Sequence, residues 1–157
     1  MMKKCMLFLF IFSTSYSVAS DDVSLTLEGY IKAKCGFTMQ ENDLQFPHNG
    51  LISTELVINC NSPMRMSLHS EHGGLLHLQG RKVNGYRVSL SVAGLSLSES
   101  FLARNLIDSH TLNIDQILFK KTMNLQLELT EPLIYAGEYK DILRIEMTPA
   151  ASSGGIW

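Results

Sequence analysis

The sequence predicts an all-β protein, and within that class an incomplete immunoglobulin-like sandwich of about six strands completed by a donor strand. Apolar residues recur at every second position along most of the chain, which is the period of strands with one face on a core and the other in water. Clusters of Gly, Pro and Asn, typical of turns, separate these runs. About six runs follow Cys35, whereas a closed sandwich of this kind generally needs about seven strands.

Residues 1–20 are predicted to be a signal peptide. Lys3 and Lys4 form a charged start, the apolar run "CMLFLFIF" follows, and "SVAS" before Asp21 supplies small residues for cleavage. The apolar run is shorter than the roughly 20 residues that span a bilayer, so it does not predict a membrane anchor. We therefore expect an exported protein whose mature chain begins at Asp21.

The length and net charge of the mature protein limit its number of domains and its classes of partner. The 137 residues from 21 to 157 suit one domain with one core. Loss of Lys3 and Lys4 leaves 11 of the 13 basic residues against 15 acidic ones, so the net charge is 11 − 15 = −4. A chain with this mild acidic balance offers no basic patch for nucleic acid or for an anionic membrane surface.

The alternating runs define the expected strands. Each run presents apolar side chains to one face and polar side chains to the other, as in antiparallel sheets. The turn signals between the runs are "FPHNG", "NSP", "EHGG", "VNG" and "EPLIYAG". The runs fall at residues 23–31, 52–60, 64–68, 86–92, 123–129 and 143–147.

Two segments depart from this pattern. In residues 95–121, "ESFLARNLI" has helical spacing while "TLNIDQILF" reads as a strand. We expect a long crossing there that adds one strand near residues 112–119. Residues 150–157, "AASSGGIW", are small apart from the terminal Trp157, and are expected to form a flexible tail outside the fold.

Two cysteines remain after removal of Cys5 with the signal peptide. Cys35 and Cys60 would lie in a compartment that oxidises thiols, which favours a single disulfide. A closed loop of about 26 residues corresponds to roughly 3 to 4 kcal/mol of loop-closure stabilisation. A catalytic thiol would require a C-x-x-C pair or a neighbouring base, and neither is visible.

The segment "HSEHGGLLH" contains the strongest candidate for a metal site. His69, His72 and His77, with Glu71, have side chains that bind transition metals. A polar hairpin with its turn at "GG" explains the same residues, and we favour it. The chain has no G-x-S-x-G, no H-E-x-x-H and no glycine-rich phosphate loop, so we expect neither an enzyme nor a cofactor.

The layout of the chain resembles the subunits of chaperone-usher pili, the fimbriae of Gram-negative bacteria. The resemblance covers the mature chain and rests on an alternating arm, on Cys35 and Cys60 in the first two strands, and on "LQFP" between them. The ending "AGEYKDILRIEMTP" is similar to the G-x-Y-x-D/G start of the final strand in that family. The close cysteines are similar to those of the spore-coat-U-like, archaic or alternative branches. The penultimate tyrosine of the better-known branch is absent.

The resemblance implies assembly by donor-strand exchange. Residues 21–31 would be a donor-strand arm, residues 32–149 the pilin-like sandwich, and the last strand a wall of the acceptor groove. The implied partners are a periplasmic chaperone, an outer-membrane usher, other pilus subunits and a host or surface receptor. The implied locations are the periplasm during assembly and then the cell surface. The donor residues would be Val23, Leu25, Leu27 and Gly29, and the groove residues Leu143, Ile145 and Met147.

Two other classes stay open at this point. A tip adhesin would need a sugar pocket with aromatic side chains, and the candidates are scattered along the sequence: Tyr30, Tyr86, Tyr135, Tyr139 and Trp157. The alternative is a self-contained periplasmic or secreted β-sandwich that binds a sugar or, through the histidines, a metal. Such a protein would fold as a monomer without a chaperone.

Overall fold

The computed structural model describes residues 23–39, 41 and 43–150. The predicted signal peptide, the first two residues of the arm and residues 151–157 of the predicted tail lie outside the described residues. Within the described part the chain is all-β, with eleven strands and one short 3-10 helix, and none of its helices is long and apolar enough to cross a membrane. The residues up to Ile31 and those from Lys32 onward form separate units and are described separately.

The larger sheet contains five antiparallel strands in the order β1-β2-β9-β6-β7. The alternating runs that predicted β2, β6 and β9 place every second side chain in the core. The bounds are Cys35–Met39 for β1, Leu51–Cys60 for β2, Phe119–Leu129 for β9, Tyr86–Val92 for β6 and Ser98–Leu102 for β7.

Two three-stranded antiparallel sheets complete the fold. One has the order β11-β3-β8, with β11 at Leu143–Pro149, β3 at Met64–Ser70 and β8 at His110–Ile114. The other has the order β10-β4-β5 and is built from very short strands: Tyr139–Lys140, Leu75–His77 and Val83–Asn84.

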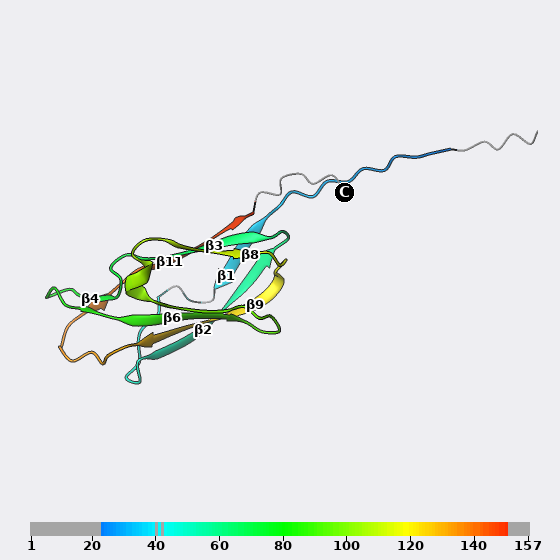
Figure 1. The fold of residues 1–157 in the computed structure, drawn as a ribbon. Coiled ribbons are helices and arrows are strands. Elements are labelled where there is room, and N and C mark those ends of the chain that lie inside the picture. The colour runs from blue at the N-terminus through cyan, green and yellow to red at the C-terminus, as the bar shows by residue number, and fades with distance from the viewer. Residues whose placement is uncertain (1–22, 40, 42, 151–157) are drawn as a thin grey trace, which may run out of the picture. The chain divides into compact units, whose positions relative to one another are not determined.

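The core lies between the first two of these sheets. Figure 1 shows β3, β8 and β11 in one layer and β2, β6 and β9 in another. Side chains from both layers form one buried cluster, in which Met66 and Leu68 of β3 and Val88 and Leu90 of β6 are at most 1% exposed. This arrangement is consistent with a β-sandwich.

The predicted disulfide is confirmed. Cys35 and Cys60 are bonded and stand directly opposite each other on β1 and β2. Asn61 extends the pairing beyond the bridge, because its side chain accepts a hydrogen bond from the Lys34 amide at 2.7 Å and donates one to the Lys32 carbonyl at 3.1 Å. The backbone amide of Asn61 also donates to the Lys34 carbonyl at 3.2 Å. Residues 32–34 are thereby held as a continuation of β1.

The crossing in residues 95–121 contains more structure than predicted. It holds β7, the 3-10 helix η1 at Ala103–Leu106, and β8, whereas the sequence led us to expect one added strand. Ala103 and Leu106 are fully buried. The helical spacing in "ESFLARNLI" reflects this single turn, which places Leu106 in the core between the two layers.

The predicted hairpin at "HSEHGGLLH" is wrong. β3 and β4 lie in different sheets and do not pair, because residues 71–74 carry the chain from one layer to another. The two glycines do adopt the positive φ expected of a turn, 68° at Gly73 and 153° at Gly74. Both also stand against other segments, since an added Cβ would lie 2.7 Å from Ile107 Cδ1 at the first and 2.6 Å from the Asn84 carbonyl oxygen at the second.

Candidate functional site: an open groove between the first and last strands

Two strands at the edges of the sandwich lack a neighbour on one side. β1 pairs only with β2, and β11 pairs only with β3, among the strands that the structure describes. The two strands contact each other without forming a ladder. At the opposite side of the sandwich the edge strands are β7 and β8, and there η1 contacts β3 of one layer and β6 and β7 of the other. The sandwich is therefore covered on one side and open on the other.

A groove of about 1020 Å³ occupies the open side. Its floor is formed by the core, with the buried side chains of Leu56 of β2 and Leu125 of β9 in the lining. One wall comes from the end of β1 and the loop after it, and the other from the start of β11. The main apolar side chains of these walls are Phe37, Met39, Leu44, Phe46, Leu143 and Ile145.

The side chains that face the groove point inward but are not covered. Phe37 stands opposite Ile58 in the β1–β2 register and so lies on the same face of the sheet. Ile58 is fully buried, whereas Phe37 is 40% exposed. On β11 the core-facing residues Leu143, Ile145 and Met147 are each half-buried, although the β3 residues paired with them are fully buried. The apolar side chains on both walls are therefore only partly covered.

A buried carboxylate holds one end of the groove. The Asp141 side chain is 3% exposed and precedes β11. Its Oδ2 accepts hydrogen bonds from the hydroxyls of Ser70 (2.5 Å) and Tyr86 (2.7 Å). Its Oδ1 accepts from the amides of His72 and Ile142, both at 2.9 Å, and lies 3.3 Å from the His72 ring. Asp141 thus ties the start of β11 to β3, to the following loop and to β6 in the other layer.

Tyr86 is the cross-layer member of this cluster. Burial, together with its hydrogen bond to the carboxylate of Asp141, raises the pKa of Tyr86 far above its usual range. The phenol therefore remains a donor at any physiological pH. Its ring lines the groove and lies 6.1 Å from that of Phe46, centroid to centroid.

The Asp141 cluster combines a serine, a histidine and an aspartate, but not in the order of a catalytic triad. In a triad the imidazole lies between the carboxylate and the nucleophile. Here the carboxylate lies between Ser70 and His72, and Ser70 is fully buried and donates to it. The arrangement fixes the position of a strand and offers no accessible nucleophile.

The predicted histidine cluster is dispersed. His72 lies against Asp141, the His77 ring packs against that of Tyr139 with the centroids 4.8 Å apart and the planes inclined at 60°, and His69 belongs to β3. In the described part of the chain, His, Cys, Asp and Glu side chains nowhere gather in groups of three or more that could hold a metal ion.

The arm is described as a unit of its own. Residues 23–31 form neither helix nor strand. Val23, Leu25 and Leu27 are 82%, 81% and 92% exposed, and an added Cβ at Gly29 would meet nothing within 4 Å. Three alternate positions of this segment, Val23, Leu25 and Leu27, thus carry exposed apolar side chains.

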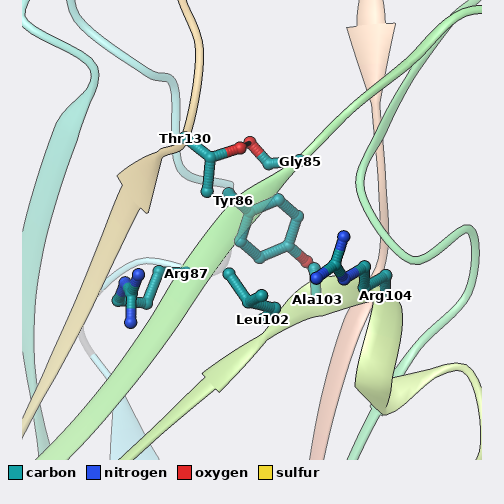
Figure 2. A pocket seen from close by; sticks show the side chains of 7 residues that line it. All are labelled: Gly85, Tyr86, Arg87, Leu102, Ala103, Arg104 and Thr130. Atoms are coloured by element: carbon teal, nitrogen blue, oxygen red, sulfur yellow. Dashed lines mark hydrogen bonds between the residues drawn. The ribbon is translucent and has the colours of Figure 1, made fainter.

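A smaller pocket of about 310 Å³ lies beside Tyr86 (Figure 2). Thr130 closes one end, because its hydroxyl donates to the Gly85 carbonyl at 2.9 Å. Figure 2 shows Arg87 and Arg104 on opposite sides of Leu102, so the two guanidinium groups do not converge on one ligand position.

The sequence nominated only one wall of the groove. The β1 wall was missed because β1 has five residues and includes Gly36, which leaves little alternation to detect. Phe37 and Met39 do share the spacing of two with Cys35, which is the signal that identifies them.

A scan against protein-family models, a search of curated proteins and a search of solved structures found no match to this chain.

Proposed function

We propose that this protein is a structural subunit of a surface fimbria, assembled by donor-strand exchange and contributing to adhesion. One observation carries the proposal. The domain has a groove between β1 and β11 with core residues in its floor, and the same chain carries an arm in which the alternating residues Val23, Leu25 and Leu27 are exposed. On this proposal the fold is an immunoglobulin-like sandwich that lacks one strand, and the strand comes from the arm of another subunit.

The arm has the length and pattern that the groove requires. Its 11 residues, 21–31, span up to roughly 36 Å when extended. The 7 residues of β11 span roughly 23 Å, so the arm can line the whole strand. Burial of Val23, Leu25 and Leu27 against the core contributes on the order of 1.5 to 3 kcal/mol for each side chain, before the cost of ordering the arm.

The connection between arm and domain argues for exchange between molecules. Returning the arm to its own groove would require a turn immediately before Cys35. Residues 32–34 are Lys-Ala-Lys, without Gly, Pro, Asn or Asp, and Asn61 holds them in line with β1. A groove on a second subunit needs no such turn.

The open groove also explains the need for a chaperone. Unpaired backbone groups at the edges of β1 and β11, together with half-exposed apolar side chains, make a subunit prone to aggregate. On this proposal the signal peptide exports the chain, a periplasmic chaperone lends a strand to the groove, and an outer-membrane usher replaces that strand with the arm of the next subunit. The assembled fibre would stand on the cell surface.

Deletion of residues 21–28 tests the proposal. The truncated subunit retains its groove, so its chaperone should still hold it and a synthetic arm peptide of residues 21–31 should still bind. It should not polymerise when mixed only with itself. Light scattering of chaperone-released subunits and fluorescence titration of the peptide measure the two properties. Polymerisation by the truncated chain, or failure of the peptide to bind it, would overturn the proposal.

A further inference from the structure

A second apolar surface lies at the β10 end of the domain. It contains Leu78 (50% exposed) and Val83 (39%) from the β4–β5 region, and Leu133 (37%), Ile134 (70%) and Tyr135 (61%) from the loop after β9. We refer to these five residues as the end patch. The two segments adjoin, because the Lys82 ammonium lies 5.6 Å from the centroid of the Tyr135 ring.

Two hydrogen bonds to backbone carbonyls hold the end patch in place. The Leu78 amide donates to the Glu138 carbonyl at 2.8 Å, and the Tyr139 hydroxyl donates to the Tyr135 carbonyl at 2.9 Å. These bonds fix the loop after β9 against the β4–β5 turn. The exposed side chains therefore sit on a defined surface rather than on a free loop end.

The end patch is continuous with the groove. Leu78 and Leu133 belong to both, and the groove lining runs from Ile145 past Tyr139 towards them. Of the core-facing residues of β11, the groove lining includes Leu143 and Ile145 but not Met147, so the groove lies towards the β10 end of that strand. The groove thus leads out onto the end patch.

We propose that the end patch seats the folded domain of a second copy of this chain, the copy whose arm fills the groove. This inference rests on the proposed function and deepens it. The short connection between the arm and the domain leads to this inference. Ile31 ends the arm and Cys35 is already bonded to Cys60, so the four steps between them span at most about 14 Å. If the arm of a second copy leaves the groove at the β10 end, the Cys35–Cys60 bridge of that copy must lie next to the end patch. We call the part of the domain around this bridge the disulfide end.

The disulfide end also carries exposed apolar side chains. Ile117 and Phe119 are each 57% exposed, and the Lys120 ammonium lies 5.5 Å from the centroid of the Phe119 ring. The Cys60 amide donates to the Leu118 carbonyl at 2.9 Å, which places this segment beside the bridge. Contact of Ile117 and Phe119 with the end patch would remove apolar surface from water on both copies.

Cross-linking locates the contact. A photoreactive amino acid replaces Ile134 in the full mature chain, fibres are assembled and irradiated, and the cross-linked peptides are identified by mass spectrometry. The inference predicts cross-links to residues 32–34 or 115–121 of another copy. Cross-links confined to other regions, or none in fibres that have formed, would overturn it.

A pair of variants separates this inference from the proposed function. Ile134→Ser with Tyr135→Ser removes the two most exposed side chains of the end patch, and Ile107→Ser removes a similarly exposed residue (51%) elsewhere. We expect the double variant to bind the arm peptide normally but to dissociate from a neighbouring subunit about tenfold faster. The control should bind the peptide normally and dissociate at the same rate as the unaltered chain. Normal peptide binding with unchanged dissociation would refute the end-patch contact and leave the fimbrial proposal standing. Loss of peptide binding by the unaltered chain would refute both.

Discussion

Asp141 is the residue on which one end of the groove depends. Its carboxylate accepts hydrogen bonds from β3, from β6 and from the loop after β3, and so joins the two layers on the side where no strand bridges them. A buried carboxylate is costly unless its oxygens are fully hydrogen-bonded, and here both are. The cluster keeps the start of β11 at a fixed distance from β6.

Replacement of Asp141 by Ala should lower the free energy of unfolding by about 3 kcal/mol, because the hydroxyls of Ser70 and Tyr86 would be left buried without an acceptor. Tyr86→Phe is the matched control and should cost only about 1 kcal/mol, since it removes one hydrogen bond. Urea unfolding in the presence of saturating arm peptide measures both. Equal losses in the two variants would show that the carboxylate does not join the segments.

Alkaline pH should destabilise the domain through Tyr86. Its pKa is raised by burial and by the hydrogen bond to Asp141, whereas in the unfolded chain it titrates near pH 10. A group whose pKa is raised on folding contributes its full stability below the unfolded pKa. That contribution is lost as the pH rises above about 10. Unfolding at pH 8 to 11 should therefore show a steeper fall for the unaltered chain than for Tyr86→Phe, and parallel curves would contradict this assignment.

The strands themselves show what the sequence could predict. Long runs of alternating residues predicted β2, β3, β6, β9 and β11, because each buries one face against a shared core. β4, β5 and β10 were missed, since two or three residues carry no measurable period. In residues 95–121, β7 has no buried side chain and β8 has one, Ile114, so neither strand shows a clear alternation in the sequence.

The groove was predicted in part. The β11 wall could be predicted because the alternation of Leu143, Ile145 and Met147 is regular, although the groove lining includes only the first two. Asp141 was visible as part of a motif, but its role depends on Ser70 and Tyr86, which lie 71 and 55 positions away. No pattern in the sequence reports contacts at that separation.

The two faces of the arm should differ in their sensitivity to charge. Successive side chains of a strand point to opposite faces, so Leu25 would enter the groove while Ser24 would face away from it. Leu25→Asp drives a charge into an apolar site, and we expect the arm peptide to lose more than about a hundredfold in affinity. Ser24→Asp should change the affinity by less than about threefold. Titration of the two peptides decides, and equal effects would mean that the arm does not bind as a strand.

The two sides of the sandwich, where the edge strands of its two layers lie, differ in how they are covered. On one side the chain supplies its own cover, because η1, with Leu106 fully buried, contacts β3 of one layer and β6 and β7 of the other. On the other side β1 and β11 do not pair with each other, and the groove lies between them. We propose that a strand from another molecule closes this second side.

A linked donor strand tests that claim most directly. Fusing a copy of residues 22–32 after Pro149 through a flexible linker provides the strand at an effective concentration near millimolar. We predict a monomer on size-exclusion chromatography with a higher melting temperature than the unfused mature chain, which should refold poorly or associate. If the unfused chain refolds alone into a stable monomer and the linked strand adds nothing to its melting temperature, the sandwich is already complete and the account is wrong.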